Sequence, residues 1–198
     1  MKKIITILSL IIISIITFKV LLDKTIYIDS FYNIVKNIIN DDLTKYIKFF
    51  TNISGYIVLI SLTLLLSFII SDRNIRILIP CNVTFIFLLN YILKVIIRRP
   101  RPVVNQLISE IGFSYPSGHS MVGTAFYGLL LYLVYKYVKN KYLKYSLMVL
   151  LSIIIIFVPL SRVYLGVHYT SDVLVGFLIS IVYLIFLIDY LKDKKYVK

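Results

Sequence analysis

Cysteine is nearly absent from this sequence. Cys81 is the only cysteine in 198 residues, and it lies within an apolar run. A single cysteine excludes an intrachain disulfide and makes a cysteine-based metal site implausible. We therefore interpret Cys81 as a small buried hydrophobic residue.

Acidic residues are also scarce, with 9 Asp and Glu against 22 Lys and Arg, which gives a formal net charge of +13. A basic chain can indicate nucleic-acid binding. Here the basic residues fall between long apolar runs, and 60% of all residues are hydrophobic. A soluble domain of this size could not bury that excess. The composition indicates a membrane protein whose basic residues meet lipid headgroups or mark cytoplasmic loops, with no nucleic acid as a partner.

Six segments are long and apolar enough to be transmembrane helices, which need about 20 mostly apolar residues. They are residues 4–22, 56–70, 77–97, 121–137, 145–160 and 173–191. The first could be a signal peptide, but no small-x-small cleavage site follows it, so an uncleaved helix is favoured. No Pro/Gly-rich linker divides the segments. We expect one all-α domain over residues 1–198, a polytopic membrane protein with six transmembrane helices.

Basic residues in the loops predict the orientation of these helices. With the N-terminus inside, twelve bases fall on the cytoplasmic side: Lys2, Lys3, Arg73, Arg76, Lys136, Lys139, Lys141, Lys144, Lys192, Lys194, Lys195 and Lys198. Four fall in the first outer loop: Lys24, Lys36, Lys45 and Lys48. The pattern predicts a multi-pass protein of the cell membrane with both termini in the cytoplasm. Residues 98–101, Arg-Arg-Pro-Arg, are an exception to this pattern, because they place basic residues on the outer side. A functional role is the natural reason for these residues.

The stretch between the first two spans is too polar to cross a membrane. Phe31, Ile34, Val35, Ile38 and Ile39 nevertheless share one helical face. We expect one or two amphipathic helices on the outer interface. Such a segment could simply pack over the bundle, or it could form a wall beside the point where a lipid enters. The sequence does not decide between these two roles for residues 26–50.

Polar residues gather at the outer ends of the last four spans, although they are spread over about 80 residues of sequence. Lys94, Arg101 and Arg162 are three cations that the topology brings to one surface. Unpaired cations near hydrocarbon are costly, so we expect an anion among them. Ser117 and Gly118 precede the fourth span and supply a hydroxyl and backbone N–H groups near the positive end of a helix, where anions bind readily.

Both histidines of the chain belong to the same set. His168 and Asp172 are four residues apart, so on a helix they share a face and can form a hydrogen bond. A carboxylate that orients an imidazole favours nucleophilic attack by the other ring nitrogen. His119 could then protonate a leaving oxygen as a general acid. Fixed cations could stabilise the charge on a transferring phosphoryl group, and the mechanism requires no metal and no cofactor.

Three motifs in this region resemble the signatures of the type 2 phosphatidic acid phosphatase (PAP2) superfamily. They are Lys94-x6-Arg101-Pro102, Pro116-Ser117-Gly118-His119 and Ser161-Arg162-x5-His168-x3-Asp172. The motifs run over residues 94–172. Every signature position is present at the expected spacing, and the three ordered motifs together are far more specific than any one alone. Arg98 and Arg99 lie outside the signature, and contact with headgroups or a topological role is as reasonable for them as catalysis.

The resemblance implies a membrane lipid phosphatase with a phosphohistidine on His168, Asp172 as its partner and His119 as the acid. It implies phosphate binding by Lys94, Arg101, Ser117, Gly118 and Arg162, with the site on the extracellular face. The substrate could be a polyprenyl diphosphate such as undecaprenyl diphosphate, which the short chain slightly favours. The alternative substrate is phosphatidic acid or phosphatidylglycerol phosphate. The alternative is a non-catalytic lipid-binding protein on the same fold. The oligomeric state is not readable from the sequence.

Overall fold

The computed structural model describes residues 1–23 and 26–193, and every regular element in these ranges is helical. Lys24, Lys194, Lys195 and Lys198, which the predicted orientation uses, lie outside the described residues. The elements are α1 (Lys2–Leu21), η1 (Tyr27–Phe31), α2 (Tyr32–Val35), η2 (Lys36–Ile38), α3 (Asp41–Thr51), η3 (Asn52–Ser54), α4 (Tyr56–Ile69), α5 (Arg73–Ile97), α6 (Gly118–Tyr137), α7 (Lys141–Tyr164) and α8 (Thr170–Asp193).

Each of the six apolar segments of the sequence coincides with one long helix: α1, α4, α5, α6, α7 or α8. Several helices extend beyond their apolar run, because polar residues cap them. Asp72 accepts hydrogen bonds from the backbone N–H groups of Asn74 and Ile75 and begins α5. Asn140 accepts one from Leu143 and begins α7. Such caps satisfy first-turn N–H groups that have no partner within the helix.

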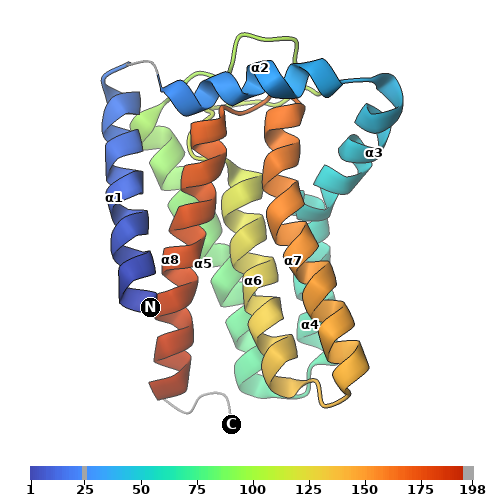
Figure 1. Cartoon of the computed structure of the whole chain (residues 1–198). Coiled ribbons are helices and arrows are strands. Elements are labelled where there is room, and N and C mark those ends of the chain that lie inside the picture. Colours follow the sequence, from blue (N-terminus) through green and yellow to red (C-terminus); the bar gives the residue numbers. More distant parts are fainter. Residues whose placement is uncertain (24–25, 194–198) are drawn as a thin grey trace.

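Helix α6 lies at the centre of the bundle (Figure 1) and packs against α5, α7 and α8. Its residues Met121–Tyr127 are all buried. The largest apolar cluster joins α6 to its neighbours through residues such as Leu59, Ile79, Ile86, Phe126 and Leu129. Because α6 carries the second motif at its N-terminus, this packing fixes the start of α6 relative to the ends of α5, α7 and α8.

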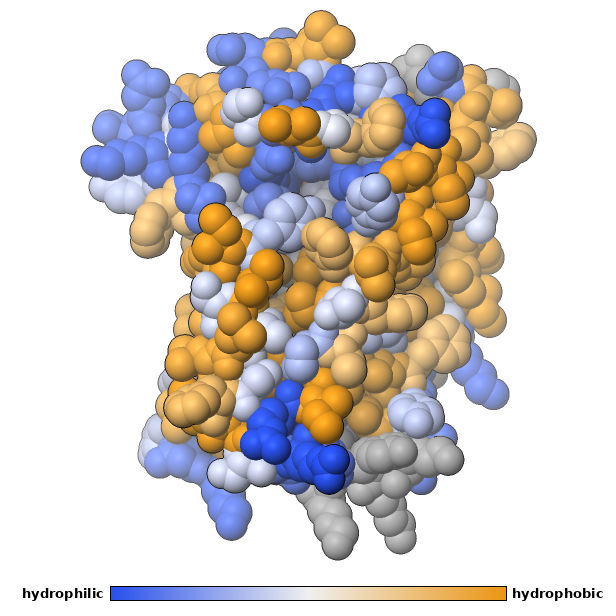
Figure 2. All heavy atoms as spheres, turned by 180° about the vertical axis from the view of Figure 1, so that it is seen from behind, coloured by the Kyte–Doolittle hydropathy of each residue, from blue (hydrophilic) through white to orange (hydrophobic). Residues whose placement is uncertain are grey.

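On the face seen in Figure 2, an apolar belt lies between two polar ends. Large apolar side chains of α1, α4 and α5 are exposed, among them Ile7, Phe18 and Phe68. This is the surface expected of a membrane protein. Cys81 is exposed on α5, so the interpretation of it as a buried residue is wrong. Cys81 is on a helix that is long and apolar enough to cross a membrane, and a small, weakly polar thiol needs no protein around it there.

Among the described residues, four helices (α1, α5, α7 and α8) are long and apolar enough to cross a membrane. A fifth span is possible if Asp41–Ser54 and Tyr56–Ile69, which meet at 46°, count as one broken span. Helix α6 does not reach this apolarity. It is enclosed by other helices, so its side chains contact protein and need not be as apolar as those that contact lipid. The count of six spans stays a prediction.

The segment between α1 and α4 forms short helices. Elements η1, α2 and η2 run across one end of the bundle, over the ends of α7 and α8 (Figure 1). Asn40 then caps α3 by accepting a hydrogen bond from Leu43 N. The loop of residues 98–117 and the link of residues 165–169 lie at the same end (Figure 1). We refer to this end as the site end.

Helices α6 and α8 approach closely at Gly176. A Cβ atom on Gly176 would lie 2.8 Å from Ser117 O, at the N-cap of α6, and 3.3 Å from the backbone N of Met121 in α6. We expect Gly176→Ala to push the two helices apart and to cost about 1–3 kcal/mol of stability, as overpacking generally does. The measurement is the thermal midpoint in detergent.

Gly128→Ala is the matched control on α6. There the added Cβ would meet the Cδ1 of Leu184, the far end of a side chain that can rotate away. Gly176→Ala should therefore lower the midpoint more than Gly128→Ala. Equal losses would contradict the close contact of α6 and α8 as the cause.

Candidate active site

A cavity of about 390 Å³ opens at the site end, and both histidines, His119 and His168, line it. Of the eight site residues expected from the sequence, five line it: Lys94, Arg101, Gly118, His119 and His168. Tyr56, Tyr91 and Glu110 also line it. Asp172, Arg162 and Ser117 are not among the lining residues; Asp172 and Arg162 contact residues that are. The structure therefore brings histidines of two distant motifs to one cavity.

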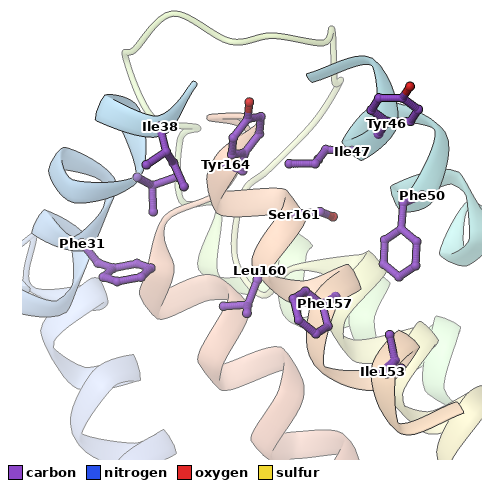
Figure 3. A pocket seen from close by; sticks show the side chains of 11 residues that line it. Phe31, Ile38, Tyr46, Ile47, Phe50, Ile153, Phe157, Leu160, Ser161 and Tyr164 are labelled. Atoms are coloured by element: carbon purple, nitrogen blue, oxygen red, sulfur yellow. The ribbon is translucent and has the colours of Figure 1, made fainter. Parts of the chain in front are cut away.

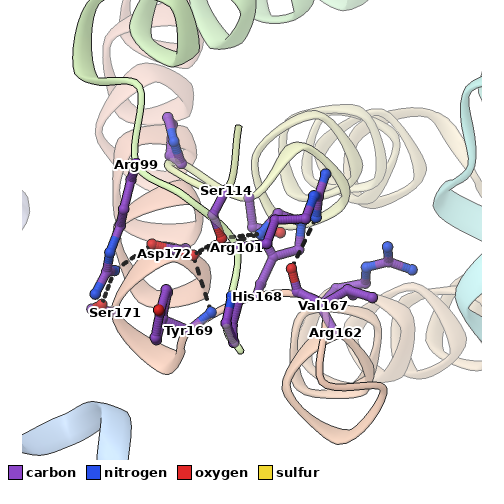
Figure 4. Close-up of polar contacts among 12 residues, drawn as sticks. Arg99, Arg101, Ser114, Arg162, Val167, His168, Tyr169, Ser171 and Asp172 are labelled. Carbon is purple, nitrogen blue, oxygen red and sulfur yellow. Dashed lines mark hydrogen bonds and ion pairs between the residues drawn. The ribbon is translucent and has the colours of Figure 1, made fainter. Parts of the chain in front are cut away.

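His168 lies in the link between α7 and α8, where Gly166 at φ +70° permits the turn. Its Nε2 atom is 3.3 Å from Nη1 of Arg101 (Figure 4). A guanidinium can only donate, so Nε2 is the acceptor. Neutral His168 then carries its proton on Nδ1, and its Nε2 lone pair points to Arg101. This tautomer is the one that a nucleophilic Nε2 requires.

The proton on His168 Nδ1 faces the carboxylate of Asp172, with 3.6 Å between Nδ1 and Oδ2. Ser114, which belongs to none of the three motifs, contacts both residues. Its Oγ is 3.3 Å from His168 Nδ1 and donates a hydrogen bond to Asp172 Oδ2. Ser114 sits in the loop outside all three motifs, so no sequence signal marked it.

Arg99, whose role the sequence left open, contacts the other oxygen of Asp172. Its Nη1 donates to Asp172 Oδ1 at 2.5 Å and to Ser171 Oγ at 2.7 Å (Figure 4). Its Nη2 donates to Asp29 Oδ2 at 2.8 Å. Arg98, by contrast, is exposed and donates only to the carbonyl of Val95 among the bonds described. The two neighbouring arginines therefore have different surroundings.

Arg101 and Lys94 are held by carbonyl groups of the loop. Arg101 donates to the carbonyl oxygens of Gly112, Ile111 and Val167 at 3.0, 2.9 and 2.9 Å. Lys94 Nζ donates to Phe113 O at 2.5 Å and to Ser114 O at 3.3 Å. These bonds fix both cations against the cavity, and they leave the positive charges without a full counter-ion.

An anion does lie among the cations, as expected, and it is Glu110, the only glutamate in the chain. Its carboxylate accepts a hydrogen bond from Arg162 Nη2 and lies 3.8 Å from Arg101 Nη2. The Arg162 side chain is 1% exposed. Its Nη1 donates to Thr51 at 3.0 Å, and its Nε has no partner among the described residues. A buried guanidinium N–H without an acceptor is costly and suits an anionic ligand.

The start of α6 differs in part from expectation. Gly118 lines the cavity, and first-turn N–H groups of a helix have no acceptor within it. The Ser117 hydroxyl does not line the cavity and accepts a hydrogen bond from Ser120. The Ser117 backbone N–H donates to Asp172 O at 3.1 Å. Ser117 therefore joins the starts of α6 and α8, while Gly118 faces the cavity.

His119 lines the cavity beside Tyr56, and the centroids of the two rings are 6.1 Å apart. It belongs to the first turn of α6, so the packing of that central helix holds it. His168 is 4% exposed. Burial lowers the pKa of His168 to about 4, with Asp172 acting in the opposite direction. His168 is therefore neutral at physiological pH, with its proton on Nδ1.

No group of three or more His, Cys, Asp or Glu side chains that could hold a metal ion occurs in residues 1–23 and 26–193. The fold and the site define a helical membrane protein that carries a basic cavity and a buried His–Asp pair at one end of its bundle. The model of the PAP2 superfamily matches residues 76–196. The chain belongs to that superfamily.

Known relatives agree with this assignment. Phosphatidylglycerophosphatase B of Bacillus subtilis (strain 168) is 40% identical over 111 residues, which cover 54% of this chain and 53% of the relative. The chain thus matches about half the length of that protein. The crystal structure of a transmembrane PAP2 type phosphatidylglycerolphosphate phosphatase from Bacillus subtilis has a TM-score of 0.82 at 26% identity, covering 98% of this chain and 96% of that one. LpxE of Aquifex aeolicus shares the fold, with a TM-score of 0.66 at 22% identity over 81% of this chain and 94% of that one.

The protonation of His168 can be measured directly, because the chain has only two histidines. In the variant His119→Asn, His168 is the sole imidazole, and NMR of the labelled ring follows it alone. We expect a midpoint near pH 4 rather than 6.5, because burial lowers the pKa of His168 to about 4.

Unfolded imidazoles titrate near 6.5, so this lowered pKa also makes the folded state lose stability as the pH falls from about 6.5 towards 4. Circular dichroism at each pH separates titration of the folded protein from unfolding. A midpoint near 6.5 in folded protein would contradict the burial of the ring.

Proposed function

We propose that this protein is a membrane lipid phosphatase that transfers phosphate through a phosphohistidine on His168. The observation that carries the proposal is the arrangement of His168: its Nε2 faces Arg101 in a cavity that His119 and Lys94 also line. Its Nδ1 faces Asp172. The nucleophile, the proton donor and the phosphate-binding cations thus meet around one space. The motifs within residues 94–172 support treating residues 1–198 as one phosphatase domain.

The proposed reaction has two half-reactions. In the first, the Nε2 lone pair of His168 forms a bond to phosphorus while the bond from phosphorus to the leaving oxygen breaks. His119 protonates that oxygen. In the second, His119 accepts a proton from water, the water oxygen bonds to phosphorus, and the phosphorus–nitrogen bond breaks. Inorganic phosphate and neutral His168 result. Asp172 stabilises the positive charge on the phosphorylated imidazole.

Lys94, Arg101 and Arg162 leave an excess of positive charge in the site, since Glu110 is the one carboxylate among the described residues that line the cavity. A phosphate group would be balanced by that excess, and its oxygens would bind the first-turn N–H groups near Gly118. We assign Ser117 to the same region through its backbone. Fixed cations of this kind supply the stabilisation that a metal ion supplies in other phosphoryl-transfer sites, and we propose that catalysis is metal-independent.

An apolar groove beside the site supports a lipid as substrate. It encloses about 540 Å³ between α7 and the segment from Phe31 to Phe50 (Figure 3). Ile38, Ile47, Phe157 and Leu160 point into it. Ser161 also lines the groove, and the next residue, Arg162, binds Glu110 at the polar cavity. We propose that the segment is a wall of the path by which the lipid reaches the cavity, rather than only a cover.

For the substrate we propose a glycerolipid phosphate of the phosphatidylglycerol phosphate type. Two relatives support this choice over undecaprenyl diphosphate, since their names describe phosphatases of phosphatidylglycerophosphate. This revises the slight preference for a polyprenyl diphosphate that the short chain suggested. Phosphatidic acid presents the same phosphomonoester chemistry and remains within the proposed class.

For the topology we propose six spans, both termini in the cytoplasm and the site end on the extracellular face. Lys2 at the start of α1 pairs with Asp189 near the end of α8, which supports placing both chain ends on one side. The site lies at the opposite end of the bundle (Figure 1). Helix α6 crosses as the enclosed central span.

The central test is phosphate release by His168→Ala and His119→Ala in detergent micelles. We expect a loss of about 10³-fold or more for His168→Ala, and about 10²- to 10⁴-fold for His119→Ala, since each removes a reacting group. Activity of the wild type should persist in EDTA. Lys139→Ala, at an exposed base between α6 and α7, should retain full activity.

Full activity of His168→Ala, or loss of activity in EDTA, would overturn the mechanism. A wild type that binds phosphatidylglycerol phosphate without releasing phosphate would instead favour the non-catalytic lipid-binding alternative. A higher kcat/KM for undecaprenyl diphosphate than for phosphatidylglycerol phosphate would move the substrate to the other class and leave the mechanism in place.

Glu110→Gln tests whether the carboxylate occupies the place of a phosphate. Arg162 loses its acidic partner in this variant, and we expect a stability loss of about 2 kcal/mol. Inorganic phosphate should then raise the thermal midpoint more in Glu110→Gln than in the wild type, because the ligand restores the missing negative charge.

Asp42→Asn removes an exposed acid of α3 and serves as the control. Its response to phosphate should match that of the wild type. A phosphate response in Glu110→Gln that is equal to or smaller than that of the wild type would contradict the proposed competition.

A further inference from the structure

We propose that Arg99 and Asp29 form a clamp that positions Asp172 for turnover, which makes the segment of η1 a working part of the active site. The proposal rests on the proposed function and adds two positioning residues to it. Neither residue belongs to the three motifs. Asp29 lies 143 positions before Asp172 in the sequence, on the segment between α1 and α2.

Both carboxylate oxygens of Asp172 have partners, and the clamp holds one of them. Arg99 holds Oδ1, while Oδ2 accepts hydrogen bonds from Ser114 and from Tyr169 N and faces His168. With both oxygens bound, the plane of the carboxylate is fixed. The orientation of the His168 imidazole, which faces this carboxylate, is fixed with it.

Asp29 completes the arrangement from the other side. Its Oδ2 accepts from Arg99 Nη2, and its Oδ1 accepts from the backbone N–H of Ser171 at 2.8 Å. Ser171 is in the first turn of α8, where N–H groups lack intrahelical partners. Asp29 therefore caps α8 from a distant segment while it orients the guanidinium of Arg99. The Tyr169 ring lies 3.8 Å from Arg99 Cζ and covers the guanidinium face.

Charge balance explains why the clamp is needed. The Asp172 side chain is fully buried, and a buried carboxylate requires a cation. His168 is neutral because burial lowers its pKa to about 4, so it cannot be that cation before phosphate is transferred. Arg99 supplies the charge. Burial opposes the charge of Arg99, but the carboxylates of Asp172 and Asp29 outweigh burial and raise its pKa.

The clamp is separate from the phosphate-binding cavity. Arg99, Asp29 and Tyr169 line a different cavity of about 440 Å³, and Arg99 is not among the residues that line the cavity of the histidines. Loss of the clamp should therefore affect the chemical step and leave phosphate binding almost unchanged. A phosphate-binding arginine would show the opposite pattern.

The test compares kinetics of Arg99→Gln, Arg99→Lys and Asp29→Asn on phosphatidylglycerol phosphate. We expect kcat to fall about 10- to 100-fold in Arg99→Gln, as for partners that orient a reacting ligand. KM and the inhibition constant for inorganic phosphate should change by less than about 3-fold, since no ground-state contact is lost. Arg99→Lys should recover only part of kcat, because an ammonium cannot bridge two carboxylates with a planar fork.

The double variant Asp29→Asn/Arg99→Gln shows whether the two residues act together. If they form one clamp, it should lose no more kcat than Arg99→Gln alone. Arg98→Gln and Asp193→Asn, at an exposed arginine and an exposed aspartate, are the matched controls and should retain the wild-type kcat. Thermal midpoints identify variants that fail to fold.

An unchanged kcat in folded Arg99→Gln would overturn the proposal, and so would a raised KM at unchanged kcat, which would mark Arg99 as a substrate-binding residue. If the wild type released no phosphate from any lipid, the proposed function would fail. The clamp would then be tested by thermal midpoints alone. A decrease of the midpoint in the double variant that is smaller than the sum of the two single decreases supports the clamp. Strictly additive decreases of the midpoint overturn the clamp.

Discussion

Buried charge that must be neutralised determines the arrangement of the site end. Arg162 and Asp172 are almost completely enclosed, and neither could remain charged in an apolar surrounding without an opposite charge nearby. Glu110 neutralises Arg162, and Arg99 neutralises Asp172. Both partners, Arg99 and Glu110, lie in the loop of residues 98–117. The two ion pairs therefore attach this loop to α7 and α8. The walls of the cavity are thereby set by electrostatics as much as by packing.

The apolar bundle provides the rigid base for these pairs. Helix α6 is enclosed by α5, α7 and α8, and Gly176 lets α8 approach the backbone of α6 at Ser117. The hydrogen bond from Ser117 N to Asp172 O joins the starts of both helices. His119 and Asp172 therefore stand on elements whose relative position is fixed below the site, which is the condition for a preorganised centre. The loop of residues 98–117 adds Arg99 and Arg101 to this base, and the short link between α7 and α8 adds His168.

The positions of the long helices were predictable from apolar runs, whereas their ends were not. Asp72 and Asn140 are polar and fall outside those runs, yet they begin α5 and α7 because their side chains cap the first turn. The motif residues were predictable for a different reason, since their spacing is a property of the sequence itself. Five of them line the cavity. Ser117 does not line the cavity, because its hydroxyl turns to Ser120 instead. The sequence does not specify whether a hydroxyl at a helix start faces a cavity or a neighbouring residue.

The remaining site residues could not be predicted, because they depend on contacts across the chain. Arg98 and Arg99 have the same chemistry and adjacent positions. Arg98 adopts φ 51° at the end of α5 and points outward, while the next residue turns inward to Asp172. Ser114 and Asp29 lie outside any motif, and only the folded loop and the η1 segment bring them to Asp172.

The anion expected among the cations illustrates how far physical reasoning from sequence reaches. Three clustered cations require negative charge, and that requirement was foreseeable; its source, Glu110, was not. A single carboxylate carries one negative charge against the charges of Lys94, Arg101 and Arg162, so it satisfies the cluster only in part. A phosphate group brings more charge and more acceptor oxygens, including one for the unpaired Nε of Arg162. Under the proposed function, the cluster that pairs with Glu110 would exchange that carboxylate for phosphate, and the residual positive charge would provide the driving force.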